Sequence, residues 1–405
     1  MSTRLALGAS LLLGSAGAAL GGSLTEDLAA AAREGTTTLA FRYRIETVDE
    51  DAFERDAFAS TLRSRLGYAT RPLHGWSLAV EVDDVRHLGS DRYADTRNGV
   101  TDRPQVVDPE GTDLNVAMLR YTGGTGTELR LGRQRIERVN QRFVGGVGWR
   151  QNEQTYDAIS LTRAFGKEAH ASLAWVGQVN RIHGPDDGIP PADLDSNSQL
   201  LDLDWTPDPR IALNAYACLM DFDNADALSN RTLGLRATGS QSLGGEWKLG
   251  YAAEFARQAD HGDNPVDYAA NYTLLEVSVG LPRLALRLGH EVLEGDSTAG
   301  RAFRTPLASL HLFQGWADKF LTTPNAGVED LYVAVNGKLI GADWLLRLHD
   351  FRAEAGDGDW GREIDASASW PIGKHYTVLL KAASFDAEDL ATDTTKLWLM
   401  ATASF

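Results

Sequence analysis

Pairs of arginine residues two positions apart occur near the start of the chain. The segment TLAFRYRIE carries Arg42 and Arg44, and the segment STLRSRLGY carries Arg63 and Arg65. Side chains two residues apart in a β-strand point to the same face, so each pair presents two guanidinium groups side by side. A guanidinium group binds a carboxylate through two parallel hydrogen bonds and stays charged in water. The spacing therefore predicts a surface that binds or conducts anionic groups.

The opposite faces of these two segments are apolar. Leu39, Phe41 and Tyr43 alternate with the first arginine pair, and Leu62 and Leu66 flank the second. An arginine on the lipid-facing side of a membrane strand costs roughly 2–4 kcal/mol near the midplane. If these segments cross a membrane, the arginines are expected to face the interior of the structure.

Similar alternation adds acidic and basic candidates in later segments. Glu81 and Asp83 alternate with valines in SLAVEVDDV, whereas Gly132 permits a β-bulge and leaves the faces of Arg133 and Arg135 open. The predicted pore-lining or substrate-binding residues are Arg42, Arg44, Arg63, Arg65, Glu81, Asp83, Arg130, Arg133, Arg135, Arg150 and Arg347.

Two interpretations of this charged surface remain open. A ring of arginine side chains selects for anions in a pore, which would make the surface a channel wall for carboxylated solutes. Alternatively, pairs of arginine with aspartate or glutamate brace the wall and contact no solute. Both interpretations can hold for different residues of the same wall.

The composition excludes other classes of protein. The formal net charge is −17, whereas a nucleic-acid-binding protein presents a basic surface. The chain has one cysteine, Cys218, and its histidines are scattered singly, so no metal-ligand cluster is recognisable. We therefore expect no catalytic residue, no metal and no cofactor, and we do not expect an enzyme.

Strand-like segments fill most of the chain. About eighteen such segments follow one another, each of roughly 10–14 residues, whereas strands of soluble proteins most often have about five or six residues. A tilted strand of about ten residues is what a bilayer requires. The segment lengths therefore favour membrane-spanning strands.

The connections between these segments are of two kinds that alternate. Short joints with Gly or Pro, such as 71–75 and 123–126, are followed by longer acidic joints, such as 88–112, 138–153 and 295–327. Outer-membrane barrels have short turns on the periplasmic side and long loops on the outer side. The sequence thus predicts an all-β fold, a transmembrane antiparallel outer-membrane β-barrel of about 18 strands, with an error of about two strands either way.

The end of the chain fits this barrel. TTKLWLMATASF alternates apolar side chains up to Phe405, and we expect this last strand to pair with the first, because a membrane tolerates no open sheet edge. Its terminal aromatic residue is similar to the signal read by the outer-membrane assembly machinery. Membrane lipid and lipopolysaccharide are the other expected partners. The alternative is a terminal edge strand of a soluble sheet.

The N-terminal segment is expected to be removed. Residues 1–22 have a basic start, an apolar run and small residues, which is the pattern of a signal peptide. The alternative, a membrane anchor helix, is disfavoured because the run is short and interrupted by Gly8 and Gly14. Residues 23–405 are then one barrel, monomeric, in the outer membrane of a Gram-negative bacterium.

Three long joints are candidates for narrowing or plugging the pore: 88–112, 138–153 and 295–327. In the last, LASLHLFQGWADKFL has apolar residues near helical spacing. It would form a short helix that folds into the mouth of the barrel. Alternatively, it packs on the rim through its aromatic residues.

Several of these segments resemble the alginate-export family of proteobacterial outer-membrane porins. The most specific is GRQRI followed by NQRFVGGVGWRQNEQTYDA, and RYRIETVDEDAF, TLRSRLGY and TPLASLHLFQGWADKF add to it. The resemblance covers about Ser23 to Phe405 and implies an 18-stranded barrel with an electropositive lumen for an anionic polysaccharide or its monomers. The short turns leave no match to the long periplasmic gating loop of the alginate exporter, which argues against alginate itself as the cargo.

The expected function is an outer-membrane channel, or porin, for diffusion of small anionic or carboxylated solutes, with uronate polysaccharide export as a further option. One alternative is a plugged barrel that binds surfaces through its acidic loops. Another is an outer-membrane hydrolase, but His349 and Asp350 are adjacent in a strand and point to opposite faces.

Overall fold

The computed structural model describes residues 21–89, 91–124, 126–296 and 299–405. The expected signal peptide therefore lies, up to residue 20, outside the described residues. A helix, α1 (Gly21–Arg33), precedes the first strand. No helix among the described residues is both long and apolar enough to cross a membrane.

Eighteen strands form one closed antiparallel sheet, as the sequence predicted. The first nine are β1 (Thr36–Glu50), β2 (Ala57–Ala69), β3 (Trp76–His87), β4 (Gly111–Gly123), β5 (Thr127–Gln134), β6 (Thr155–Phe165), β7 (Ala169–Asn180), β8 (Asp193–Asp208) and β9 (Ile211–Met220). The other nine are β10 (Asn230–Gly244), β11 (Trp247–Asp260), β12 (Ala269–Leu281), β13 (Leu284–Leu293), β16 (Val328–Leu339), β17 (Ala342–Arg352), β18 (Asp359–Ile372), β19 (Tyr376–Ala387) and β20 (Thr394–Ser404).

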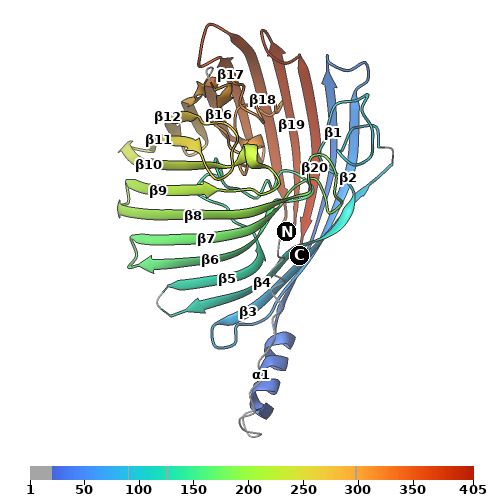
Figure 1. The fold of residues 1–405 in the computed structure, drawn as a ribbon, viewed down its shortest axis with the longest axis vertical. Coiled ribbons are helices and arrows are strands. Elements are labelled where there is room, and N and C mark those ends of the chain that lie inside the picture. The colour runs from blue at the N-terminus through green and yellow to red at the C-terminus, as the bar shows by residue number, and fades with distance from the viewer. Residues whose placement is uncertain (1–20, 90, 125, 297–298) are drawn as a thin grey trace.

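The barrel closes between β1 and β20, as Figure 1 shows. Their register runs from Ala40 opposite Ser404 to Glu50 opposite Thr394. The last residue takes part, because the Phe405 N–H donates to the Leu39 carbonyl at 2.8 Å and the Leu39 N–H donates to the Phe405 carbonyl at 3.1 Å. Closure leaves no strand edge with unpaired backbone groups in the bilayer.

Side chains alternate between an apolar outer face and a polar inner face. Along β13, Leu284, Leu286 and Leu288 are 49%, 52% and 47% exposed on the outside. Aromatic residues gather at the short-turn end of the strands, where an interface girdle is expected. These exposed aromatic residues are Trp76, Phe165, Trp205, Trp247, Tyr376 and Phe405.

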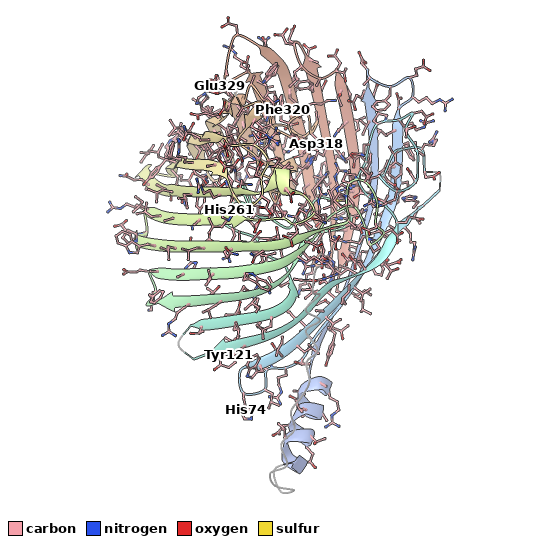
Figure 2. All side chains as sticks on the ribbon, viewed as in Figure 1. His74, Tyr121, His261, Asp318, Phe320 and Glu329 are labelled. Atoms are coloured by element: carbon pink, nitrogen blue, oxygen red, sulfur yellow. The ribbon has the colours of Figure 1, made fainter. Side chains whose placement is uncertain are left out.

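Short turns and long loops lie at opposite ends of the barrel. The helix α1 extends from the short-turn end, below the strands in Figure 1. It is attached there by an ion pair of 2.7 Å between Glu34 and Arg71, beside the turn that carries His74 in Figure 2. The longest loops join β3 to β4, β5 to β6 and β13 to β16, and the last contains the two-residue strands β14 (Gly295–Asp296) and β15 (Arg301–Ala302).

The segment LASLHLFQGWADKFL lies inside the barrel but is not the short helix that the apolar spacing suggested. It contains a single 3₁₀ turn, η2 (Leu310–Leu312), and is otherwise irregular; another such turn, η1 (Asp226–Leu228), lies in the loop after β9. Phe320 is buried against Phe351 and Phe385 of the inner wall, with ring centroids 4.6 and 6.0 Å away. The segment is thus held in place by packing against the barrel wall and not by helical hydrogen bonds.

The two-faced strand pattern predicts a strong effect of one outward substitution. Leu288→Arg places a charge on the lipid face, and we expect it to lower the free energy of unfolding by roughly 2–4 kcal/mol. Urea unfolding in lipid vesicles measures this change. Ala285→Arg, whose side chain lies on the inner face of the same strand, is the matched control. Equal stability of both variants would contradict the assignment of faces.

Candidate functional site

Two long loops enter the barrel and contact each other. They are residues 135–154 between β5 and β6, and residues 294–327 between β13 and β16, and we call them the inner loops. Val144 and Leu307 form a parallel bridge between them, and the Val147 N–H donates to the Ser309 hydroxyl at 2.9 Å. Figure 2 places Asp318 and Phe320 inside the ring of strands. The lumen is therefore narrowed by a joined pair of loops.

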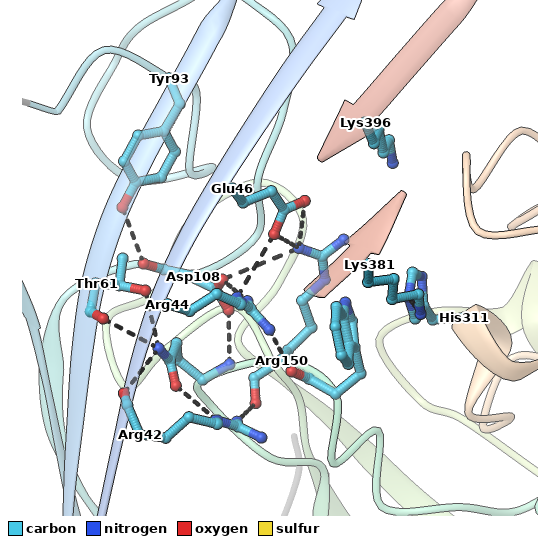
Figure 3. A network of polar contacts seen from close by, with 12 residues as sticks. Arg42, Arg44, Glu46, Thr61, Tyr93, Asp108, Arg150, His311, Lys381 and Lys396 are labelled. Carbon is cyan, nitrogen blue, oxygen red and sulfur yellow. Dashed lines mark hydrogen bonds and ion pairs between the residues drawn. The ribbon is translucent and has the colours of Figure 1, made fainter. Parts of the chain in front are cut away.

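The arginines of β1 hold the first inner loop. Arg42 donates to the Gln151 side chain at 2.9 Å and to the Gly148 carbonyl at 2.7 Å. Arg44 donates to the Trp149 carbonyl at 2.5 Å and forms an ion pair with Asp108, which comes from the loop between β3 and β4. The two side chains are only 7% and 1% exposed. Both guanidinium groups are thus occupied by the loops, as Figure 3 shows.

A cluster of charges joins the inner loops to each other and to the wall. Asp318 of the second inner loop accepts hydrogen bonds from Lys396 at 2.9 Å and from Arg150 at 3.2 Å, and it contacts His311 at 2.7 Å. Arg150 also lies 3.3 Å from Glu46 of β1. Burial raises the pKa of Asp318, but His311, Lys396 and Arg150 outweigh it and hold that pKa well below its usual range.

Further contacts attach the second inner loop to β18 and β19. The Glu363 carboxylate accepts the backbone N–H groups of Trp316 and Ala317 at 2.5 and 2.7 Å. The Lys381 ammonium lies 3.6 Å from the ring centroid of Trp316 and 4.1 Å from that of Trp149. Cation–π contacts of this kind are worth about 2 kcal/mol when desolvated. Lys381 thereby bridges the wall and both inner loops.

The arginines of β2 belong to a second cluster. Arg65 forms two hydrogen bonds of 2.6 Å with Asp83 and an ion pair of 2.9 Å with Glu153 of the first inner loop. Glu81 and Arg135 complete this cluster, with Arg135 bound to Glu153 at 2.6 Å. Burial raises the pKa of Glu153, but Arg65 and Arg135 outweigh burial and hold that pKa well below its usual range, so the carboxyl stays ionised.

The remaining predicted residues lie apart from these clusters. Arg130 pairs with Glu128 near the short-turn end, with Nε 2.7 Å from the carboxylate. Arg133 bonds to Asp157 at 2.8 Å. Arg347 lies on the far wall, 5.9 and 5.6 Å from the ring centroids of Trp316 and Tyr332. The eleven predicted residues are therefore not one site.

Buried nitrogen atoms without a hydrogen-bond partner among the described residues occur in Arg44, Arg63, Arg138, Arg142 and Arg347. Two of these arginines, Arg63 and Arg347, are among the predicted residues with the fewest contacts to the loops. Arg63 lies 3.6 Å from Glu153, and its Nε and Nη1 atoms are buried without a hydrogen-bond partner. The Nε atom of Arg347 is also buried without a partner, and no carboxylate among the described residues lies within ion-pair distance of its guanidinium. Arg347 lines a cavity of about 200 Å³ together with Arg236 and Arg287 and with the carboxylates Glu276, Glu291 and Asp330. Arg347 is therefore a cation that lies at a mixed-charge cavity and has no ion pair of its own among the described residues.

Sequence reasoning missed the carboxylates that hold the loops. Asp108, Glu153 and Asp318 lie in loops, where no alternation indicates which way a side chain points. A signal existed for Glu153 and Arg150, since both occur in the loop segment GWRQNEQ, which is dense in charged and amide residues. Among the described residues, no group of three or more histidine, cysteine or acidic side chains is placed to hold a metal.

Comparison with protein families gives a match to the alginate export family over residues 34–280. No curated protein sequence matches the chain. Solved structures of similar fold include OpdK of Pseudomonas aeruginosa with vanillate, at 13% identity, a TM-score of 0.72, and coverage of 92% of this chain and 99% of that one. OccK9 (OpdG) of the same species has 17% identity, a TM-score of 0.72, and coverage of 93% and 99%. OccAB2 of Acinetobacter baumannii has 16% identity, a TM-score of 0.71, and coverage of 93% and 99%.

Removal of the Asp318 charge should loosen the second inner loop. In Asp318→Asn, Arg150 and Lys396 lose their shared carboxylate, and breaking a buried ion pair in this way costs about 3–5 kcal/mol. We expect larger and noisier single-channel currents in a planar bilayer. Asp343→Asn, which breaks an exposed turn pair with Lys338, should leave the current unchanged. Identical currents from all three proteins would show that the cluster does not hold the loop.

Acid should release the same loop. Burial lowers the pKa of His311 from 6.5 to about 4 when the loop is docked. Between pH 6.5 and pH 4 the undocked loop therefore binds more protons than the docked loop, and docking weakens as the pH falls. The depressed pKa of Asp318 acts in the same direction at still lower pH. We expect the open fraction of single-channel recordings to rise between pH 7 and pH 4. A fraction that falls over this interval would contradict the assignment.

Proposed function

Since the chain belongs to the alginate export family, we propose that it is a diffusion channel for small solutes that carry a carboxylate group. It is an outer-membrane channel of a Gram-negative bacterium, and lipid surrounds its outer face. The preference for anions and the carboxylate class are the parts of the proposal that go beyond the family. The proposed function includes no catalytic step.

The observation that carries the proposal is the unused guanidinium of Arg347. A buried N–H group without a partner costs about 1–3 kcal/mol, and a solute carboxylate would satisfy it with a charge-assisted hydrogen bond. The rings of Trp316 and Tyr332 beside it offer faces for an apolar or aromatic solute body. Arg63 on β2 supports the proposal, because its Nε and Nη1 atoms have no hydrogen-bond partner among the described residues and its ion pair with Glu153 is long, at 3.6 Å.

The other arginines fit the bracing interpretation better. Arg42 and Arg44 bind loop carbonyls and Asp108, and Arg65 and Arg135 share carboxylates with Glu81 and Glu153. A neutralised pair adds little field in the pore. We therefore assign the anion preference chiefly to Arg63 and Arg347, and not evenly to all predicted residues.

Small solutes suit this lumen better than a polysaccharide. The inner loops occupy the interior, and the turns at the other end are short, such as 340–341 between β16 and β17. The OpdK structure of similar fold was solved with vanillate, which makes small aromatic carboxylates reasonable first probes. We further propose that residues 1–22 are removed on export and that the assembly machinery reads the strand that ends in Phe405.

Replacement of Arg63 and Arg347 by neutral glutamine tests the proposal. Loss of one charge in a wet pore weakens attraction to an anion by about 1 kcal/mol, which is about fivefold in affinity. For Arg63→Gln with Arg347→Gln, we expect the reversal potential in a salt gradient to move toward cation preference and benzoate to block about fivefold less well or worse.

Arg210→Gln is the control, because Arg210 is an exposed turn residue paired with Asp208. It should match the unmodified protein in both measurements. An unchanged reversal potential in the double variant would refute the assignment of anion preference to these two arginines.

A further inference from the structure

Several arginines in the loops have no acidic partner among the described residues. Most inner arginines contact a carboxylate, but Arg97, Arg181 and Arg304 are among those with none within ion-pair distance in the part of the chain that the structure describes. Their side chains donate hydrogen bonds to neutral oxygen atoms. Arg97 donates to the carbonyls of Asp186 and Pro190, each at 2.8 Å. Arg181 donates through Nη1 to the Pro191 carbonyl at 3.1 Å. The positive charges of this region are thus solvated by dipoles and not cancelled by anions.

Arg304 repeats this arrangement on the second inner loop. It donates to the Thr323 carbonyl at 2.7 Å and to the Asn325 side-chain oxygen at 3.2 Å. Burial, followed by the neighbouring Arg301, lowers its pKa. Arg301, which lies opposite Asp296 in the β14–β15 pair, adds a second positive group close to Arg304, and positive groups that lie close together favour an anion nearby.

Two of these arginines, Arg181 and Arg304, line two adjoining cavities beside the inner loops. One cavity, of about 110 Å³, is lined by Arg181 and His183, and also by Arg150 and Asp318, which form an ion pair with each other. The next, of about 200 Å³, is lined by Arg304. Pro306 and Leu321 line both cavities, so the two form one region at the entrance to the constriction. We call Arg181, His183 and Arg304 the vestibule residues.

His183 adds an unused donor to the first cavity. It is 7% exposed, and its Nδ1 atom lies 3.5 Å from the Thr96 hydroxyl. Burial first, and then Arg181 and Arg97, lower its pKa to about 3, so the ring is neutral at physiological pH. In the tautomer whose Nδ1 accepts from the Thr96 hydroxyl, Nε2 carries the proton, and Nε2 has no hydrogen-bond partner among the described residues. A neutral N–H donor beside free guanidinium nitrogens suits a carboxylate.

We propose that the vestibule residues form a binding site for anionic oxygen groups, which captures a carboxylated solute from the outside before it reaches the constriction. This proposal rests on the proposed function and adds a direction to it, namely uptake. Arg181 retains Nε and Nη2 for a forked contact with a carboxylate. The formal charge of the chain is −17, so two neighbouring arginines without a carboxylate partner among the described residues, Arg181 and Arg304, stand out from the acidic loops around them.

Phosphate groups of lipopolysaccharide are the other source of anionic oxygen atoms for such a site. The vestibule residues lie on loops that face the interior, next to the buried inner-loop residues Ala308 and His311. Lipid head groups surround the outer face of the strands. The interior position favours a solute over a lipid as the ligand.

Side-specific block in a planar bilayer without lipopolysaccharide tests the proposal. With the barrel in one known orientation, benzoate added at the long-loop side should block the current at lower concentration than benzoate added at the turn side. For Arg181→Gln with Arg304→Gln, the long-loop side should lose about fivefold in apparent affinity, while the reversal potential keeps its anion preference.

Arg257→Gln is the matched control, because Arg257 lies near the same end of the barrel but is exposed and bonds to Asn271 at 3.2 Å. Unchanged block in the double variant would overturn the vestibule site. Loss of anion preference by the unmodified protein would instead overturn the proposed function. Side-specific block that appears only after lipopolysaccharide is added would assign the site to lipid phosphate and overturn the solute assignment.

A measurement on the unmodified protein avoids any folding defect of the variants. The ring resonances of His183, followed by nuclear magnetic resonance in detergent micelles, should shift as benzoate is added at constant pH. The resonances of His375, which lies at a short turn and bonds to the Ser404 carbonyl, should not shift. No shift of His183 at saturating benzoate would overturn the proposal.

Discussion

Every backbone polar group of a membrane-spanning segment must find a partner within the protein, because the bilayer core offers no water. This constraint determines the architecture of the chain. The first and last strands pair over the whole stretch from Ala40 to Glu50, and even the terminal Phe405 exchanges hydrogen bonds with Leu39. Because the outer face of each strand must be apolar, apolar side chains occur at every second residue. The polar residues between them point inward and line the lumen.

Inside the barrel a second requirement, an electrostatic one, applies. Buried guanidinium groups are costly unless they are paired, and the chain meets this cost by folding two loops inward. Their carbonyls and the Glu153 carboxylate, together with Asp108 of the loop between β3 and β4, supply partners to the wall arginines. The arginines that remain without carboxylates lie on the far wall and at the entrance. A few uncompensated charges, and not the total number of arginines, would then determine which solutes are attracted.

Much of this fold follows from the sequence, and the reasons are physical. Alternation in segments such as TLAFRYRIE predicts both strand and face, because the strand period is two. The alternation of short and long joints predicts the ends of the barrel. The partners of the arginines could not be predicted, since Asp318 lies 168 residues from its partner Arg150 in the chain and irregular loops carry no period. The same limit explains why LASLHLFQGWADKFL was assigned a helical pattern, although its aromatic residues are spaced to fit a wall.

The most direct test of the account is the reversal potential of the unmodified protein in a planar bilayer that separates two concentrations of potassium chloride. The account predicts discrete channel currents whose reversal potential lies toward that of chloride. A reversal potential at that of potassium would contradict the anion preference. The absence of current from correctly folded protein would contradict the channel itself.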